Sequence, residues 1–208
     1  MHTITGSAGN ANTIYSQTST FTGLGTESIT LSDTTLAASV LNTLNGNTTG
    51  NINADTVSSF TGSISDLNTM FAAKASSGDG ISFSSNSGAA DQTVTISDTT
   101  DVSVTALTTL NGHTTGNIDA SGVTSLASAS ISDIKTLLTA GNNHTNNFTS
   151  TSFNDLATVV VSDTSVSVAD LNDSITQANT ATTNPTNTVF SVSSGATITT
   201  GDEAAFTT

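Results

Sequence analysis

The chain has 208 residues, and only 9% of them are charged, far below the ~25% of typical soluble domains. Two basic residues, Lys74 and Lys135, stand against 16 acidic ones, which gives a formal net charge of −14. This balance argues against nucleic-acid binding, which needs Lys and Arg to neutralise phosphates, and against docking on anionic lipids. No window approaches the ~18 consecutive apolar residues of a membrane span, so we predict no membrane insertion.

With so few charges, solubility has to come mainly from hydroxyl and amide side chains. Such surfaces suit proteins that work outside cells in salt, where charges are screened. The chain has no cysteine, which excludes disulfides and thiolate metal sites. The first residues also lack the basic and apolar regions of a signal peptide. We therefore expect an extracellular location, on a cell surface or in a virion, and a virion protein fits the missing signal peptide at least as well as a secreted one.

The clearest feature of the sequence is internal repetition with a spacing of 65 residues. The word Ser-Asp-Thr occurs three times, at residues 32–34, 97–99 and 162–164. Longer words recur around it, namely Leu-Asn-Thr-Leu-Asn-Gly at 41–46 with Leu-Thr-Thr-Leu-Asn-Gly at 107–112, and Thr-Thr-Gly-Asn-Ile at 48–52 and 114–118. We divide the chain into a partial N-terminal repeat (1–25), repeat 1 (26–91), repeat 2 (92–158) and a degenerate or capping repeat (159–208).

In repeat 1, Ile29 and Leu31 alternate with polar residues, which predicts a half-buried strand. Apolar residues three to four apart then predict a short helix over 40–44, ended by Gly46 with a positive φ. In repeat 2 the same pattern predicts a strand at 94–96 and a helix over 106–110, ended by Gly112.

Further along repeat 1, Ile52 and Val57 predict short strands, and Ser65-Asp66 predicts the N-terminal cap of a second helix. Ile118, Val123 and Ser132-Asp133 give the same prediction in repeat 2. Residues 81–83 and 94–96 flank Gly88 and are interpreted as a hairpin.

Taken together, these elements predict a β-rich repeat protein. No half-repeat has enough apolar surface to fold alone, so neighbouring repeats have to stack. The favoured fold is an elongated solenoid of strands with short helices. A trimeric β fibre and a row of small β-sandwich modules are the alternatives.

The segment from Ile29 to Gly46 and the Thr-Thr-Gly-Asn-Ile words resemble repeat regions of giant secreted cell-surface proteins of marine cyanobacteria. The Leu-Asn-x-Leu-x-Gly kernel is also similar to marine bacteriophage tail-fibre repeats. The resemblance covers about residues 4–175. It implies a structural, motility-associated or adhesive role and carries no catalytic residues over to this chain.

The strongest candidate for a ligand site is the ladder formed by Asp33, Asp98 and Asp163. If repeats stack, three aligned carboxylates could bind Ca²⁺, which takes six to eight oxygen ligands. The alternative, which we favour, is that each Asp bonds backbone N–H groups and caps the turn that enters the following helix. Asp119 aligns with Asn53 of the previous repeat, so both suit a hydrogen-bonded turn or an amide ladder and not a charged site.

No catalytic group stands out. His113 aligns with Asn47 and is expected to be an exposed polar residue, while His144 lies in a polar loop and His2 at the terminus. No serine lies in a Gly-x-Ser-x-Gly elbow, and the single Tyr and absent Trp leave no aromatic platform for a sugar. We therefore predict no catalytic, cofactor or metal site and no enzymatic activity.

The favoured function is a non-enzymatic structural repeat module of an extracellular surface layer, filament or virion fibre. It would act through packing and subunit contacts, with copies of itself or with other surface or virion proteins as partners. The alternative is an adhesin or receptor-binding module that recognises a glycan or protein through polar loops at residues 84–90 and 141–149. A polysaccharide-acting enzyme on a β scaffold is the least favoured alternative.

Overall fold

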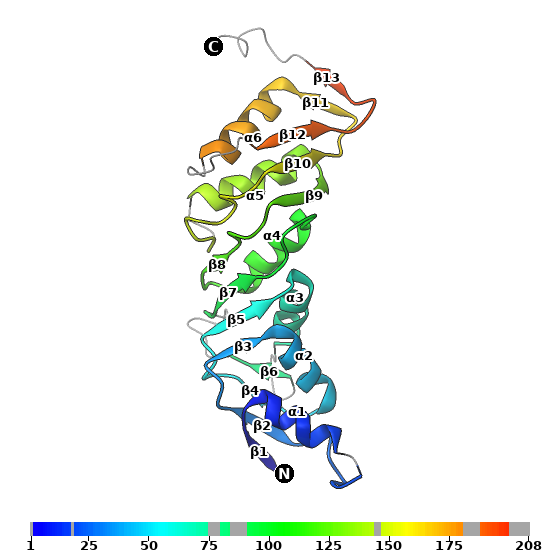
Figure 1. Cartoon of the computed structure of the whole chain (residues 1–208), viewed down its shortest axis with the longest axis vertical. Coiled ribbons are helices and arrows are strands. Elements are labelled where there is room, and N and C mark those ends of the chain that lie inside the picture. Colours follow the sequence, from blue (N-terminus) through cyan, green and yellow to red (C-terminus); the bar gives the residue numbers. More distant parts are fainter. Residues whose placement is uncertain are drawn as a thin grey trace. The chain divides into compact units, whose positions relative to one another are not determined.

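The computed structural model describes residues 2–17, 19–74, 80–83, 91–143, 147–180 and 188–199. The chain divides into two compact units. The first contains Met1–Ser97 and Gly112–Asn117, and the second contains Asp98–Asn111 and Ile118–Thr208. Each unit has its own parallel sheets and helices (Figure 1).

The first unit alternates short strands with helices of nine or ten residues. Its elements are β1 (Thr3–Gly6), α1 (Ala8–Ser16), β2 (Ser28–Leu31), β3 (Thr35–Ala37), α2 (Ala38–Asn47), β4 (Ile52–Asn53), β5 (Ser59–Gly62), α3 (Ile64–Ala72), β6 (Ile81–Ser82) and β7 (Thr93–Ile96). One parallel sheet has the order β1-β2-β4-β6, and within a second sheet β3, β5 and β7 are neighbours. Helix α2 packs against α1 on one side and α3 on the other.

In the first sheet, identical residues lie next to each other on neighbouring strands. Ile4 pairs with Ile29, Ile29 with Ile52 and Ile52 with Ile81, all in parallel register. The last three are at most 1% exposed. Such a ladder forms because side chains alternate between the two faces of a strand, so in-register pairing places every apolar residue on the same face.

Three phenylalanines fill the space beneath the second sheet. Phe60 of β5 makes edge-to-face contacts with Phe71 of α3 and Phe83, at ring distances of 6.0 and 5.7 Å. Phe60 is completely buried. Aromatic pairs of this geometry add about 0.5–1.5 kcal/mol beyond the burial of their area, so these contacts add to the stability of the unit.

The second unit continues the same alternation. Its elements are α4 (Val104–His113, whose last two residues belong to the first unit), β8 (Ile118–Asp119), β9 (Ser125–Ala129), α5 (Ile131–Asn143), β10 (Thr158–Val161), β11 (Ser165–Ser167), α6 (Val168–Thr180), β12 (Val189–Val192) and β13 (Thr197–Thr199). Strand β10 lies between β9 and β12, β11 pairs with β13, and all of these pairs are parallel. Helices α5 and α6 pack against each other. Leu126, Val159 and Phe190 lie side by side across the sheet formed by β9, β10 and β12.

The predicted β-rich solenoid of strands with short helices is wrong, and so are its alternatives, a trimeric β fibre and a row of small β-sandwich modules. The protein is mixed α/β, 35% helical and 28% strand, with parallel sheets. The parallel pairing explains the helices, because the end of one strand has to be connected back to the start of its parallel neighbour, and a helix usually makes that connection. The strand preference of Thr pointed to more strand than the protein forms. Helices such as α2 are hard to recognise in the sequence because they bury only a few apolar residues, among them Leu41 and Leu44.

Several local predictions also need correction. Residues 81–82 and 93–96 do not form a hairpin, because β6 pairs with β4 and β7 pairs with β5, both in parallel; Gly88 lies outside the described residues. Gly46 and Gly112 lie inside α2 and α4, and neither has a positive φ. Helix α3 begins at Ile64, with Ser63 and not Ser65 as its N-cap.

The repeated Ser-Asp-Thr word occupies equivalent positions in the fold. Ser32, Ser97 and Ser162 each follow the last residue of a strand, β2, β7 or β10. The backbone amide of each serine donates to the carbonyl of the last residue of the parallel neighbour, at 2.9–3.0 Å: Gly6, Gly62 or Ala129. The repeated sequence therefore builds the same local structure three times. The boundaries that we drew between repeats stay predictions.

Candidate functional sites

The three aspartates of the ladder lie two residues beyond β2, β7 and β10. The Oδ2 atom of Asp33 accepts a hydrogen bond from the amide of Ala8 at 2.8 Å, and that of Asp163 accepts one from the amide of Ile131 at 2.6 Å. Ala8 and Ile131 are the first residues of α1 and α5. The prediction that Asp33 and Asp163 bond backbone N–H groups at a helix start is confirmed, but the predicted helix is wrong, because each caps the helix before it in the chain and not the one after it. For Asp98 capping stays a prediction.

Each of these two helices also has a cap from its own chain segment. The hydroxyl oxygen of Ser7 accepts from the amide of Asn10 at 3.2 Å, and that of Ser130 accepts from the amide of Asp133 at 3.1 Å. The first amides of a helix have no partner within it, and a negative charge there is stabilised by the helix dipole. One serine and one distant aspartate together satisfy two of these amides.

The described residues contain no group of three or more His, Asp or Glu side chains close enough to hold one metal ion. The calcium alternative for Asp33, Asp98 and Asp163 stays a prediction.

The Thr-Thr-Gly words form a second structural device, which the sequence analysis missed. The hydroxyl of Thr48 donates to the carbonyl of Glu27 at 2.8 Å, and that of Thr114 donates to the carbonyl of Gln92 at 3.0 Å. A Cβ atom built on Gly50 or Gly116 would overlap the same carbonyl oxygen. The Thr and the Gly of each word thus hold one turn directly against the residue before β2 or β7. The repetition of the word was the signal that could have revealed it.

A buried carboxylate near the start of β2 was also missed. Glu27 is 5% exposed, and its Oε2 accepts hydrogen bonds from the amide of Gly25 at 2.7 Å and the phenol of Tyr15 at 3.0 Å. The bond from Gly25 holds the pKa of Glu27 below its usual value, although burial opposes this. Burial raises the pKa of Tyr15. The pair anchors α1 to the segment that enters β2.

The remaining candidate residues, Asn53, Asp119 and His113, make hydrogen bonds or ring contacts within the fold. Asn53 Oδ1 accepts from the amide of Asp55 at 3.0 Å, and Asp119 Oδ1 accepts from the amide of Ser121 at 2.9 Å. The predicted hydrogen-bonded turn is therefore confirmed at both positions. His113 is half-buried, and its ring stacks on Phe71 at 6.2 Å, so the prediction of an exposed polar residue is wrong.

His2 is exposed, and His144 lies outside the described residues. The sequence predicted two polar loops that bind a partner, at residues 84–90 and 141–149. All of the first loop and residues 144–146 of the second also lie outside the described residues.

Lys135 of α5 bridges to α6. Its ammonium lies 2.8 Å from Asp173 and 3.3 Å from Asp170. The pKa of Lys135 is raised by the hydrogen bonds to both carboxylates, and that of Asp170 is lowered by the hydroxyl of Ser167 and by Lys135. All three side chains are at least 38% exposed, so solvent screens these pairs and they stabilise the helix contact only weakly.

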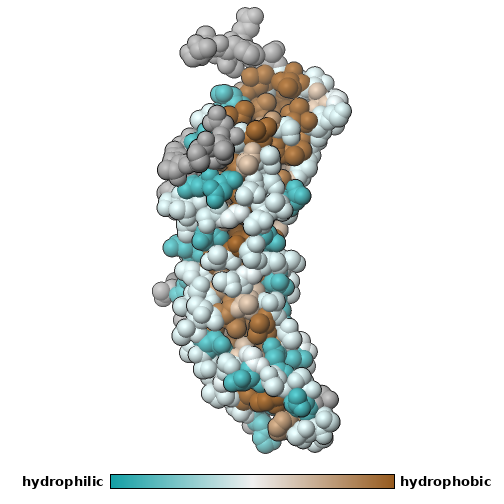
Figure 2. All heavy atoms as spheres, in the orientation of Figure 1, coloured by the Kyte–Doolittle hydropathy of each residue, from teal (hydrophilic) through white to brown (hydrophobic). Residues whose placement is uncertain are grey.

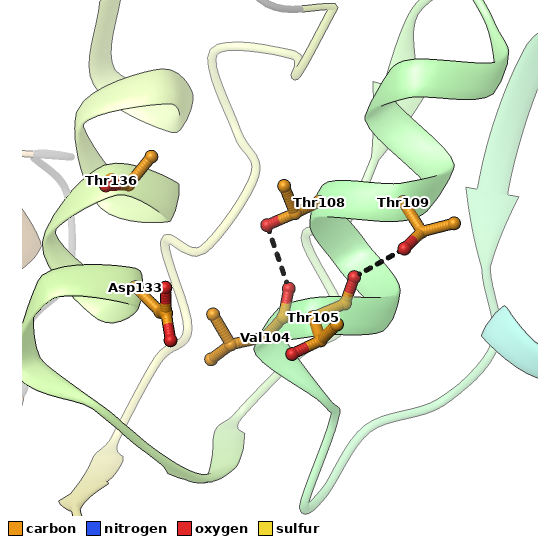
Figure 3. Close-up of a pocket in the computed structure, with 6 residues that line it drawn as sticks. All are labelled: Val104, Thr105, Thr108, Thr109, Asp133 and Thr136. Atoms are coloured by element: carbon orange, nitrogen blue, oxygen red, sulfur yellow. Dashed lines mark hydrogen bonds between the residues drawn. The ribbon is translucent and has the colours of Figure 1, made fainter.

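A groove lies between α4 and α5 in the second unit (Figure 3). One part of about 210 Å³ and a second of about 230 Å³ share Thr108 of α4 and Thr136 of α5. Their hydroxyls donate to the carbonyls of Val104 and Ser132 on their own helices, at 3.0 and 2.8 Å. The lining therefore presents mainly methyl groups with one carboxylate, Asp133. No His, Cys or Lys is among the described residues of the lining, and the groove offers a place for a small molecule.

Within the described ranges, no helix is both long enough and apolar enough to cross a membrane. Comparisons of the chain with protein-family models, with curated protein sequences and with solved structures gave no match.

Proposed function

We propose that the chain is a non-enzymatic structural repeat module of an extracellular surface layer, filament or virion fibre. The observation that carries this proposal is the use made of the repeated polar residues. Asp33, Asp163, Thr48 and Thr114 all bond backbone groups that lie 21 to 32 residues away in the sequence. The residues that recur from repeat to repeat thus hold neighbouring segments together and are not directed at a common pocket.

The composition supports a location outside the cell. Hydroxyl and amide groups bonded to the backbone keep their strength in salt, whereas surface ion pairs are screened over a few ångströms at high ionic strength. The chain has 9% charged residues and no cysteine. The resemblance to cell-surface and tail-fibre repeats leads to the same proposal.

The experiment is immunogold electron microscopy of the native material, with an antibody raised against this chain. We expect label along a surface layer, filament or virion appendage, and no label on material from which the gene has been deleted. Label confined to the interior of cells would contradict the proposal. A screen of the purified chain against polysaccharides and glycans supplies the second arm: turnover would refute the non-enzymatic role, and saturable binding would favour the adhesin.

A further inference from the structure

Two strands that share the sequence Thr-Ile-Thr each have a partner strand on one edge only within the described part of the chain. Strand β1 of the first unit reads Thr3-Ile4-Thr5 and pairs only with β2, and β13 of the second unit reads Thr197-Ile198-Thr199 and pairs only with β11 among the described residues. Both pairs are parallel. Free strand edges are templates for pairing with another chain.

The side chains on β13 lack the cover that their equivalents have. Ile198 pairs with Val166 as Phe60 pairs with Leu36. Phe60 is completely buried, because β7 continues the sheet beyond it, whereas Ile198 is 49% exposed. Figure 2 shows apolar residues gathered over the part of the second unit formed by β11, β12 and β13. Strand β5, which occupies the position equivalent to β13, is therefore covered by another parallel strand, and we expect the same kind of cover for β13.

The backbone N–H and C=O groups that point outward from β1 and from β13 lie at positions where they can bond one another. The amides of Ser28 and Ser32 donate to the carbonyls of His2 and Gly6, so the backbone groups of Thr3 and Thr5 point away from β2. The amide of Thr197 donates to the carbonyl of Thr164, so the groups of Ile198 point away from β11. In a parallel pair, each residue bonds the neighbours on either side of its partner. With Ile198 beside Ile4, its N–H meets the carbonyl of Thr3 and its carbonyl meets the N–H of Thr5.

We propose that β13 of one copy pairs in parallel with β1 of a second copy, in the register that places Ile198 beside Ile4. This inference rests on the proposed function, because it names the subunit contact through which a structural module would assemble. The new pair extends the isoleucine ladder Ile4–Ile29–Ile52–Ile81 by one strand. The contact joins two different surfaces, so each copy can accept one neighbour and donate to another, as in rings and filaments.

Neither strand carries a charged residue, and each copy has a net charge of −14. The copies therefore repel one another at low ionic strength, and salt screens this repulsion. Association should accordingly strengthen as sodium chloride is added.

The test is sedimentation of the full chain over a wide range of concentration at high salt. Wild type should form species larger than the monomer. Ile198→Lys, which places a charge at the β13 edge, and Thr5→Pro, which removes the outward N–H of β1, should each weaken association about tenfold or more. Val160→Lys is the matched control: Val160 is 37% exposed, but it lies on β10, between two other strands. This variant should associate like wild type.

A mixture of the two edge variants tests the direction of pairing. The Thr5→Pro chain keeps an intact β13 and the Ile198→Lys chain keeps an intact β1, so the mixture should form dimers and nothing larger. A wild-type chain that stays monomeric, or a mixture that stays monomeric while circular dichroism shows both variants folded, would overturn the inference. Surface label in the immunogold experiment together with a monomeric chain would refute this contact and leave the proposed function standing.

Discussion

The sharpest prediction concerns two glycines four residues apart in the first unit. Gly50 contacts the backbone at Glu27, and a Cβ atom there would overlap the carbonyl oxygen and carbon of Glu27. Gly46 lies in the last turn of α2, and a Cβ there meets nothing within 4 Å. The same substitution, Gly→Ala, should therefore have opposite effects at the two positions.

Gly50→Ala forces β2 and the Thr-Thr-Gly turn apart, and overpacking of this kind costs about 1–3 kcal/mol. Because 1 kcal/mol shifts the melting temperature of a domain of this size by about 4–8 °C, we expect a clear fall in the melting temperature of the first unit. Gly46→Ala should raise the stability by about 0.5–1 kcal/mol, since Ala loses less backbone freedom than Gly on entering a helix.

Thermal and urea unfolding followed by circular dichroism measure both variants against wild type. Gly116→Ala repeats the test, because a Cβ there would overlap the carbonyl of Gln92. If Gly50→Ala melts at the wild-type temperature while Gly46→Ala behaves as expected, the turn is not pressed against Glu27 and the role assigned to the repeated word is wrong.

Four further predictions concern polar groups. Asp33→Ala should cost about 1 kcal/mol through loss of the α1 cap, while Asp55→Ala at an exposed position should leave urea unfolding unchanged. EDTA should not alter the melting temperature, and a fall of about 10 °C would favour the calcium alternative over capping. The pKa of Glu27 is lowered in the folded state. The ionised Glu27 side chain therefore contributes to stability above its ordinary pKa of about 4.3, and this contribution is lost as the pH falls below that value. Glu27→Gln should make the melting temperature fall less steeply at acidic pH, and an unchanged acid dependence would contradict this. Ser174 is completely buried, and its hydroxyl has no hydrogen-bond partner among the described residues, so Ser174→Ala should raise the free energy of unfolding by about 1 kcal/mol, whereas a loss in the same urea titration would imply an unseen partner.

The sequence was informative about local elements. The alternation at Ile29 and Leu31 predicted β2, and the apolar spacing at Leu41 and Leu44 predicted α2. The 65-residue spacing placed Ser32, Ser97 and Ser162 at equivalent points of the fold. These features depend on residues close together in the chain, so periodicity is sufficient to find them.

The pairing of strands could not be predicted in the same way. An alternating pattern shows which face of a strand is buried, but it does not specify whether the neighbouring strand is parallel. The interpretation of 81–83 and 94–96 as a hairpin assumed that strands adjacent in the sequence also pair. Strands β6 and β7 instead pair in parallel with β4 and β5, so the resulting fold class was wrong.

The helix that Asp33 caps also could not be predicted from the sequence. The residue type of Asp33 correctly predicted a bond to helix amides, and the nearest helix in the sequence is α2. The parallel pairing of β1 with β2 brings the end of β2 beside the start of α1, so tertiary structure and not sequence distance selects the helix. A capping aspartate can be recognised in a single sequence, but its helix follows only once the strand order is known.

The bonding pattern also explains how so weakly charged a chain can fold. Thr48, Thr114 and Thr188 are all at least 93% buried, and each donates its hydroxyl to a backbone carbonyl 21 to 32 residues away. The ion pairs that Lys135 makes with its two aspartates are exposed to solvent. A buried neutral hydrogen bond contributes about 0.5–1.5 kcal/mol and does not weaken as ions are added, whereas exposed pairs contribute little and are screened. Threonine also has the branched Cβ that suits a pleated strand, so one residue type can provide both strand formation and the bonds between segments, and the fold needs few charges.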